Sequence, residues 1–411
     1  MKLWRNIVYI PRELNKLPIA IKRISFVIFL YYLSWGLLEP FLPIYFKDIL
    51  GTYTNATLVI ALLYLFSIFW SLPMGDLADK VSKKKLLRLF LIFYIPLGPI
   101  ISVLSAVWHF VVFRLWHSFL ATGLWSVSES YVRAHSPSGK TSESIGIFDF
   151  SWALSLIIGS LLGGILASLY GIRILFFIMP IFVLLALAFS RIIPDHCGTR
   201  SLSKGIKIMW ASHFLKREFR DFWKIPQLVY VTFLCFVLQL VAVSGSVLLP
   251  LFSNKLGANP IQISIIFALF YAPTLFEAPF SVLADHFNQK KILLLGSLGV
   301  IITLLVLFFA SNIMWLFGLS FCWAVFLALI YPVLAGKATA LMPREKIGEL
   351  NGVHRSFIIL ASVIGIFVIG PIADNFGINY PFLLSALIMI AFFFMILLSW
   401  SKMLGTTKPT S

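Results

Sequence analysis

Two ionisable residues lie within apolar segments of this 411-residue chain, where they could carry protons or bind a charged solute. Glu39 belongs to the segment WGLLEPFLP and Arg114 to RLWHSFLATG. A charge at the centre of a bilayer is costly unless it is paired, solvated or able to reach the interface. A carboxylate that is desolvated in a cavity can be neutral at moderate pH, so Glu39 is the better proton carrier. We predict that Glu39 is the partner of Arg114, which tunes it or binds substrate; a purely structural pair is the alternative.

A charged stretch, LADKVSKKK at 77–85, recurs in weaker form as LADHFNQKK at 283–291. An aspartate at the end of a helix can accept hydrogen bonds from the unpaired amide groups that begin a neighbouring helix, and it favours the positive end of that helix. Asp79 could therefore cap a neighbouring helix, with a simple helix stop as the alternative. The lysines that follow it are expected to orient the chain more than to take part in the mechanism.

The elements that must hold these residues are membrane-spanning helices. The chain is 60% hydrophobic and only 12% charged, whereas soluble domains carry about 25% charged residues. A helix needs about 20 apolar residues to cross a bilayer. Twelve such stretches can be drawn, at residues 24–46, 55–74, 86–106, 109–132, 145–169, 172–193, 227–251, 260–280, 291–310, 313–336, 350–372 and 378–400. We therefore predict an all-α integral membrane protein.

The net charge of +17 is explained by membrane topology rather than by nucleic-acid binding. With a cytoplasmic N-terminus, the tails and even-numbered loops hold nearly all Lys and Arg, and only Lys47, Arg173 and Lys255 fall on the opposite face. This is the positive-inside pattern, so we expect both termini in the cytoplasm and the protein in the plasma or inner membrane. The three cysteines lack paired or metal-ligand spacing. No catalytic motif appears, so we expect no metal, no cofactor and no enzymatic activity.

The chain contains two parallel copies of a six-helix unit. A shift of 206 positions without gaps superimposes Gly51 on Gly257 and Asp79 on Asp285. The same shift matches Pro137 with Pro343, Gly159 with Gly365, Gly164 with Gly370, and Gly171 with Gly377. A parallel repeat of this kind implies two bundles related by an axis along the membrane normal.

The longest polar stretch lies near the middle of the chain and is predicted to link the two halves. The predicted domains are a cytoplasmic tail at 1–23, a bundle at 24–193, a basic linker at 194–226, a second bundle at 227–400 and a tail at 401–411. Mixed basic and apolar residues within the linker allow a helix on the anionic inner leaflet. A solvated connector is the alternative.

Opposite charges near the predicted cytoplasmic ends of spans indicate an inner gate. The repeat places Asp149 on Arg355, while Glu129 and Lys337 come near the ends of the fourth and tenth spans. Such pairs can hold a gate shut and separate when the two halves rock. The alternative is that each residue is a rim charge solvated by the cytoplasm.

Residues 75–87, GDLADKVSKKKLL, resemble the cytoplasmic loop motif of the major facilitator superfamily, although Ser82 stands where that family usually has glycine. With the spans, the linker and the repeat, the resemblance covers almost the whole chain. It implies two six-helix bundles around a central cavity lined by the first and fourth spans, and a working monomer. It also implies that Asp79 caps the eleventh span when the cytoplasmic side is closed. The expected latch comprises Gly75, Asp79, Lys80, Lys84 and Asp285.

The expected function is secondary active transport of a small solute by alternating access, with proton-coupled export of an amphiphilic compound or metabolite preferred. A proton-coupled or facilitative importer of a sugar, organic acid or nucleoside shares these features. A non-transporting scaffold or receptor with this fold is a further alternative. The expected partners are a small-molecule substrate, protons and the lipid bilayer, without nucleic acid. Candidate cavity residues, chosen for their depth on cavity-type spans, are Tyr32, Trp35, Trp125, Gln239 and Tyr331.

Overall fold

The computed structural model describes residues 18–137, 140–194, 215–276, 280, 287–343 and 346–404. Every regular element within these ranges is a helix, and none of them contains a strand. The predicted all-α class is therefore confirmed.

The first half follows the predicted order of six spans, and three of these spans consist of two consecutive helical segments. The elements are α3 (Ile19–Gly36) with α4 (Leu42–Leu50), α5 (Tyr53–Lys80), α6 (Lys83–Tyr94) with α7 (Leu97–Val103), α8 (Val107–His135), α9 (Thr141–Tyr170), and α10 (Arg173–Phe189) with the 3₁₀ turn η1 (Ser190–Ile192).

The second half begins after a short linker helix. The elements are α12 (Leu215–Trp223) in the linker, then α13 (Pro226–Lys255), α14 (Pro260–Tyr271) with the 3₁₀ turn η2 (Ala272–Phe276), α16 (Gln289–Phe309), α17 (Ile313–Ala340), α18 (Ile347–Phe376) and α19 (Tyr380–Leu404).

Eleven helical segments of the described chain are long and apolar enough to cross a membrane. The remaining predicted span, at 260–280, corresponds to the shorter apolar segment Pro260–Phe276. Within it the α-helix tightens into η2 at Ala272. Pro273 lacks the backbone N–H that would continue an α-helical ladder there, which explains the change. The prediction of a multi-pass membrane protein is confirmed.

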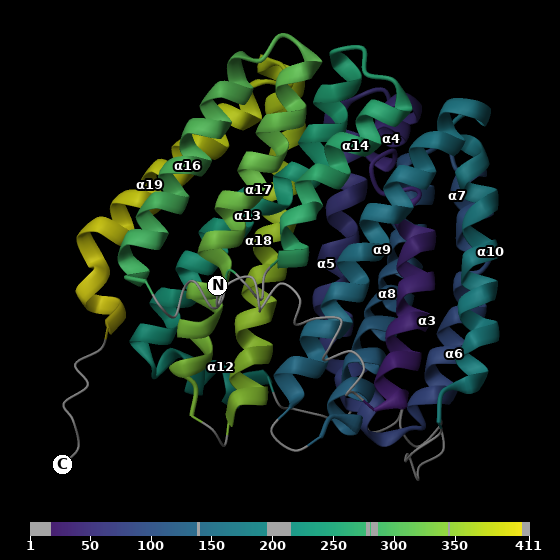
Figure 1. The fold of residues 1–411 in the computed structure, drawn as a ribbon, viewed down its shortest axis with the longest axis horizontal. Coiled ribbons are helices and arrows are strands. Elements are labelled where there is room, and N and C mark those ends of the chain that lie inside the picture. The colour runs from purple at the N-terminus through teal and green to yellow at the C-terminus, as the bar shows by residue number, and fades with distance from the viewer. Residues whose placement is uncertain are drawn as a thin grey trace, which may run out of the picture.

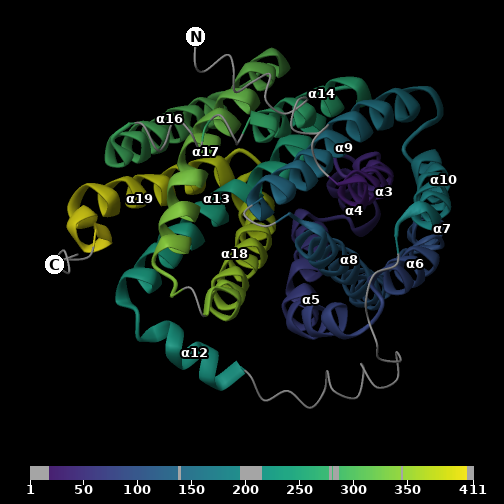
Figure 2. The same cartoon turned by 60° about the horizontal axis from the view of Figure 1, so that its bottom comes forward.

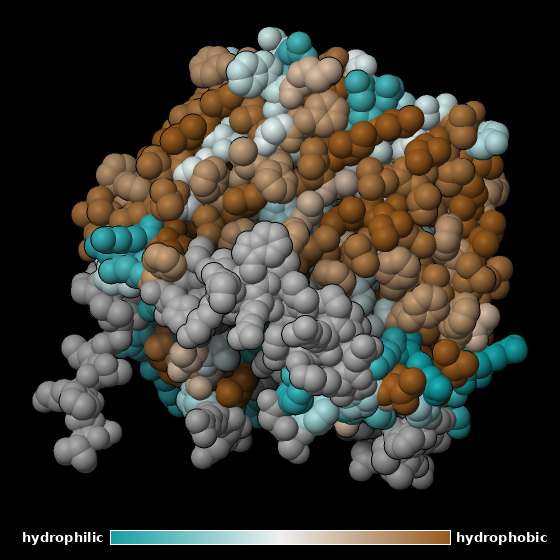
Figure 3. Space-filling model, in the orientation of Figure 1, coloured by the Kyte–Doolittle hydropathy of each residue, from teal (hydrophilic) through white to brown (hydrophobic). Residues whose placement is uncertain are grey.

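The two halves lie side by side, with the first half drawn in purple and blue and the second in green and yellow (Figure 1). Seen from below, α5 and α9 face α18 and α14 across the boundary between the halves (Figure 2). Hydrophobic side chains cover most of the visible face, and hydrophilic ones lie mainly at its two ends (Figure 3). This distribution suits a surface surrounded by lipid.

We call the end of the bundle that holds Lys80 and His135 the inner end, and the opposite end the outer end. Gly51, Gly171, Gly257 and Gly377 end helices at the outer end, and all four have positive φ angles between 80° and 107°. Only glycine adopts this conformation without strain. These four residues are the two pairs matched by the repeat, so the two copies share the same turn geometry.

The first span is broken at the level of Glu39. The α-helix α3 ends at Gly36 and α4 begins at Leu42, so the five residues between them, including Pro40, form turns. Pro40 has no backbone N–H to continue the helix. Irregular backbone at membrane depth is tolerated where it is buried in protein or lines a cavity, and Glu39 lies in that position.

Candidate functional site

A cavity of about 720 Å³ lies between the two halves. Its lining comes mainly from α3, α5, α8, α9 and α18, so the first and fourth spans contribute as predicted. It reaches from Glu39, at the break in the first span, to Arg133 and Asn351 near the inner end. The cavity is therefore placed between the middle of the bundle and its inner end.

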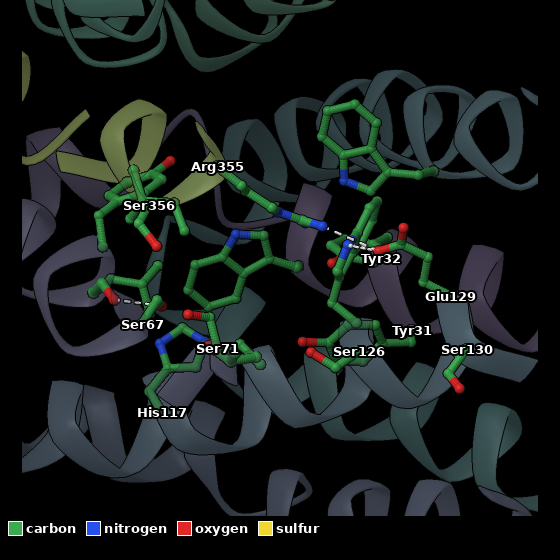
Figure 4. Close-up of a pocket in the computed structure, with 18 of the residues that line it drawn as sticks. Tyr31, Tyr32, Ser67, Ser71, His117, Ser126, Glu129, Ser130, Arg355 and Ser356 are labelled. Atoms are coloured by element: carbon green, nitrogen blue, oxygen red, sulfur yellow. Dashed lines mark hydrogen bonds and ion pairs between the residues drawn. The ribbon is translucent and has the colours of Figure 1, made fainter. Parts of the chain in front are cut away.

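Aromatic rings form one wall of this cavity. The rings of Tyr32, Trp125 and Trp152 lie 6.0 to 6.3 Å apart and are nearly perpendicular to one another. Trp35 also lines the cavity. Hydroxyl groups supply much of the polar lining, from Ser67, Ser71, Ser126 and Ser130 (Figure 4). The wall thus combines flat apolar surface with hydrogen-bonding groups, a combination typical of small-molecule sites.

Three of the five residues expected in the substrate cavity line it, namely Tyr32, Trp35 and Trp125. Gln239 and Tyr331 are not among its lining residues. Tyr331 Oη donates to Gln239 Oε1 at 3.1 Å, and Gln239 Nε2 donates to Ser362 Oγ at 3.0 Å. These bonds join α13, α17 and α18, and the cavity described above does not include Gln239 and Tyr331, so their role in substrate binding stays a prediction.

Glu39 lines the cavity, and its Oε2 atom is buried without a hydrogen-bond partner in the described part of the chain. Arg114, whose side chain is fully buried, does not form an ion pair with it. Its Nε atom donates to the carbonyl of Val59 at 3.0 Å, and its guanidinium lies 5.1 Å from the ring centre of Phe46. Glu39 and Arg114 therefore form no direct ion pair, and their partnership in proton coupling stays a prediction.

His117 is the partner of Arg114 that sequence reasoning missed. Arg114 Nη1 lies 3.0 Å from His117 Nδ1, and His117 Nε2 lies 2.8 Å from Tyr94 Oη. A guanidinium can only donate, so Nδ1 must accept; the ring is then neutral and its Nε2–H donates to Tyr94. The sequence signal was available, because residues three apart on a helix lie on one face.

At the inner end, Glu129 is the centre of a cluster that joins the two halves. Its carboxylate accepts hydrogen bonds from Trp125 Nε1 at 3.1 Å and from Arg133 Nη2 at 2.7 Å, both on α8. It also accepts from Arg355 Nη1 on α18 at 3.1 Å (Figure 4). The Arg355 guanidinium lies 5.8 Å from the ring centre of Trp125. The cavity is thus bridged by an ion pair between the halves.

This cluster corrects the expected pairing of the inner gate residues. Arg355 pairs with Glu129 instead of Asp149, which forms no ion pair within the described residues. Glu129 forms its ion pairs with Arg133 and Arg355 and none with Lys337, whose Nζ atom lies 4.8 Å from the ring centre of Trp400 on α19. The pseudo-symmetry argument failed because equivalent positions in two halves need not face each other.

Most of the expected latch lies outside the described part of the chain, namely the side chains of Asp79 and Lys80 and the whole of Asp285, while Gly75 lies within α5. The hydrogen bond that Lys84 makes within the described residues stays inside its own half. Its Nζ atom donates to the carbonyl of Arg191 at 2.8 Å, at the end of η1. The repeat reproduces this contact, since Lys290 Nζ donates to the carbonyl of Leu397 at 3.2 Å. Each lysine therefore binds the carbonyl end of the sixth span of its own half.

Comparisons with known proteins agree with this architecture. The chain is 24% identical over 393 residues to the multidrug resistance protein MdtG of Escherichia fergusonii, with 93% of each chain covered. MdtG of Enterobacter lignolyticus is 22% identical over 377 residues, which cover 88% of this chain and 87% of that relative. A segment of 136 residues is 29% identical to an uncharacterised MFS-type transporter of Methanocaldococcus jannaschii and covers 33% of this chain and 35% of that one.

Among solved structures, the human organic anion transporter MFSD10 has the same fold. It matches with a TM-score of 0.64 over 92% of this chain and 100% of that chain, at 14% identity. The family model described as Major Facilitator Superfamily matches twice, at residues 24–257 and 231–409. Two matches of one model also fit a duplicated architecture. The chain belongs to the major facilitator superfamily of membrane transporters.

Proposed function

We propose that this transporter exports amphiphilic small molecules by alternating access, in exchange for protons that bind Glu39. The observation that carries this proposal is the state of the Glu39 carboxylate. It lines the cavity at the break between α3 and α4, and its Oε2 atom is buried without a hydrogen-bond partner in the described chain. A carboxylate in such a place is stabilised by taking up a proton or by meeting a cation.

The contacts of Arg114 support this role for Glu39. The guanidinium is already held by the carbonyl of Val59 and by His117. It therefore acts on Glu39 through its electric field and not through a direct ion pair. The charge state of Glu39 is left to respond to the proton or the solute that enters the cavity.

The cavity wall supports an amphiphilic substrate. The rings of Tyr32, Trp125 and Trp152 offer flat apolar surface, while serine hydroxyls of α5 and α8 can hydrogen bond. The full-length relatives are named multidrug resistance proteins, which supports export of this class of compound.

The cluster around Glu129 is the proposed inner gate. It crosses from α8 to α18, so any rocking that widens the inner end must separate Arg355 from Glu129. Asp79 remains the proposed cytoplasmic latch, as the sequence motif implies. We further propose that the protein works as a monomer in the cell membrane with both termini in the cytoplasm, following the distribution of Lys and Arg.

The test uses purified protein in proteoliposomes with an imposed pH gradient. Substrates are first chosen by a thermal-shift screen of amphiphilic compounds in detergent at two pH values. We expect Glu39→Gln to abolish flux that is driven by the pH gradient, while Asp48→Asn transports normally. Asp48 is a matched control, because it is a carboxylate with a side chain 59% exposed, outside the cavity lining. Unchanged transport and pH dependence in Glu39→Gln would refute the proton-carrier role.

The other functions give different results in the same system. An importer of a sugar, organic acid or nucleoside moves solute in the opposite direction in oriented vesicles under the same gradients. A scaffold or receptor shows no solute flux but remains in a stable protein complex after mild solubilisation.

A further inference from the structure

We propose that Asp374 is an outer latch, which holds the outer end of the transporter closed by capping the first turn of α5 from the opposite half. Asp374 lies in the last turn of α18, in the second half, whereas α5 belongs to the first half. The inference rests on the alternating access of the proposed function, and it assigns a positioning role to a residue outside the cavity.

The hydrogen bonds at the start of α5 show how the outer latch is built. The first amide groups of a helix have no partner within the helix. Thr52 Oγ1 accepts from the Asn55 N–H at 3.1 Å. Asp374 accepts from the N–H groups of the two preceding residues. Its Oδ1 lies 3.0 Å from Tyr53 N, and its Oδ2 lies 2.8 Å from Thr54 N. The first turn of α5 is therefore completed by a side chain of the other half.

Two further contributions strengthen this contact. The hydroxyl of Thr54 donates to Asp374 Oδ2 at 2.6 Å, which is the third hydrogen bond that Asp374 accepts from α5. The carboxylate also lies at the positive end of α5, where a negative charge is favoured. All of these interactions must break if α18 moves away from α5 at the outer end.

Close backbone packing lies directly beside the outer latch. Gly370 is one helical turn before Asp374, and a Cβ atom at that position would lie 2.5 Å from Thr54 Cα and 2.8 Å from Thr54 N. No side chain larger than glycine fits there without displacing the backbone. The two helices therefore close the outer end by direct contact, and Asp374 binds at the rim of that contact.

The repeat supplies an internal comparison, because it generates an equivalent contact between α9 and α14. Gly164, which the repeat matches to Gly370, lies against Ser264 and the carbonyl of Pro260. Packing of a glycine from one half onto a helix of the other half thus occurs twice. Close packing alone does not require an aspartate.

The cap itself occurs at only one of the two contacts. The repeat matches Asp374 in the second half with Ser168 in the first. It matches Thr54 in the first half with Pro260 in the second, and Pro260 has no N–H to donate. Asn259 and Gln262 cap the start of α14 from within that helix, with bonds of 2.9 and 3.0 Å. Asp374 is therefore a feature added to one of two otherwise similar contacts, which favours a specific role.

The outer latch and the predicted cytoplasmic latch involve the same two helices. Helices α5 and α18 run in opposite directions, since α5 starts at the outer end and α18 ends there. Both end with an Ala-Asp pair, at Asp79 in LAD and at Asp374 in IAD. Asp374 thus closes the outer end in the state described here, as Asp79 is expected to close the inner end in the opposite state.

The test measures access to the cavity from outside. A variant without its native cysteines carries one reporter cysteine at Leu63, a cavity residue on α5. It is labelled with a membrane-impermeant maleimide in right-side-out vesicles, without substrate or pH gradient. We expect Asp374→Ala to raise the labelling rate about fivefold, the size typical for loss of a helix cap. Asp374→Asn, which keeps one acceptor oxygen but no charge, should raise the rate less.

Asp48→Ala is the matched control, because Asp48 is an exposed carboxylate at the outer end whose ion-pair partner, Lys47, lies in the same half. Equal labelling of Asp374→Ala, Asp48→Ala and the parent would overturn the outer latch. Labelling from the inner side is expected to fall as outer labelling rises; a rise on both sides marks unfolding. If Asp374→Ala unfolds in this way, the milder variants Asp374→Asn and Thr54→Val are used for the test instead. The outer latch is rejected if neither of them raises outer labelling.

Because the measurement needs no substrate and no proton gradient, its result does not depend on Glu39. If the labelling test fails while Glu39→Gln abolishes proton-driven flux, only the outer latch is refuted. If Glu39→Gln transports normally while Asp374→Ala raises outer labelling, only the proton-carrier role is refuted.

Discussion

The ion pair between Glu129 and Arg355 is predicted to set how often the inner end opens. The pair spans 3.1 Å, and the side chains are 18% and 47% exposed. Surface ion pairs contribute about 0.2–1 kcal/mol, and screening by water reduces the contribution of the more exposed partner. Glu129 is the less exposed residue, so we expect a coupling of about 0.5–1 kcal/mol, or about a two- to fivefold change in the open population.

A double-mutant cycle measures this coupling. Glu129→Gln, Arg355→Gln and the double variant each carry a reporter cysteine at Ser71, a cavity residue on α5. Labelling by an impermeant maleimide in inside-out vesicles reports opening of the inner end. We expect each single variant to label about two to five times faster than the parent, and the double variant to add little, because the interaction is already lost.

Glu143→Gln is the control for this cycle. Glu143 pairs with Lys140 at 3.4 Å, but both residues lie at the start of α9 in one half, so the inner gate should not respond. A coupling indistinguishable from zero, or acceleration by Glu143→Gln equal to that by Glu129→Gln, would refute the gate role of the Glu129 cluster.

Three further predictions concern stability and the linker. Gly159→Leu should lower the melting temperature in detergent, because a side chain there meets the α3 backbone and overpacking costs about 1–3 kcal/mol. His117→Phe should also lower the melting temperature, because buried Arg114 loses an acceptor, which costs about 1–3 kcal/mol of the free energy of unfolding. The ammonium groups of Lys346 and Lys224 hold the pKa of Asp221 below its usual range. This lowered pKa means that the interaction of Asp221 with the two lysines is present above about pH 4 and is lost as pH falls further. The rate of amide exchange in α12, corrected for intrinsic rates, should therefore rise only in acid. Asp221→Asn should raise this rate at pH 7.

The spans and the duplication could be predicted because they depend on local and periodic features. A bilayer requires about 20 apolar residues for each helix, whatever the neighbours are. Gly51 and Gly257 recur because the same helix end needs a positive φ angle in both halves. The break at Glu39 was not predicted, although Pro40 is a helix breaker, because the hydrophobic pattern continues through it.

The candidate site was predictable only in part. Residue type and depth were sufficient to select Glu39, Trp125 and Glu129, and all three line the cavity. Partners were not predictable in the same way. Arg355 binds Glu129 although the repeat favoured Asp149, because the rotation of each helix about its axis decides which charges meet across the boundary.

The amino-acid sequence by itself determined the class, the duplication and the positions where charge enters the membrane, since each follows from hydropathy and periodicity along the chain. Only the tertiary structure decided the interactions between distant residues. Asp374 approaches Thr54 across 320 positions, and His117 meets Tyr94 from a separate span. Such contacts depend on how helices pack and rotate against one another, and the order of residues within a single helix does not specify that packing.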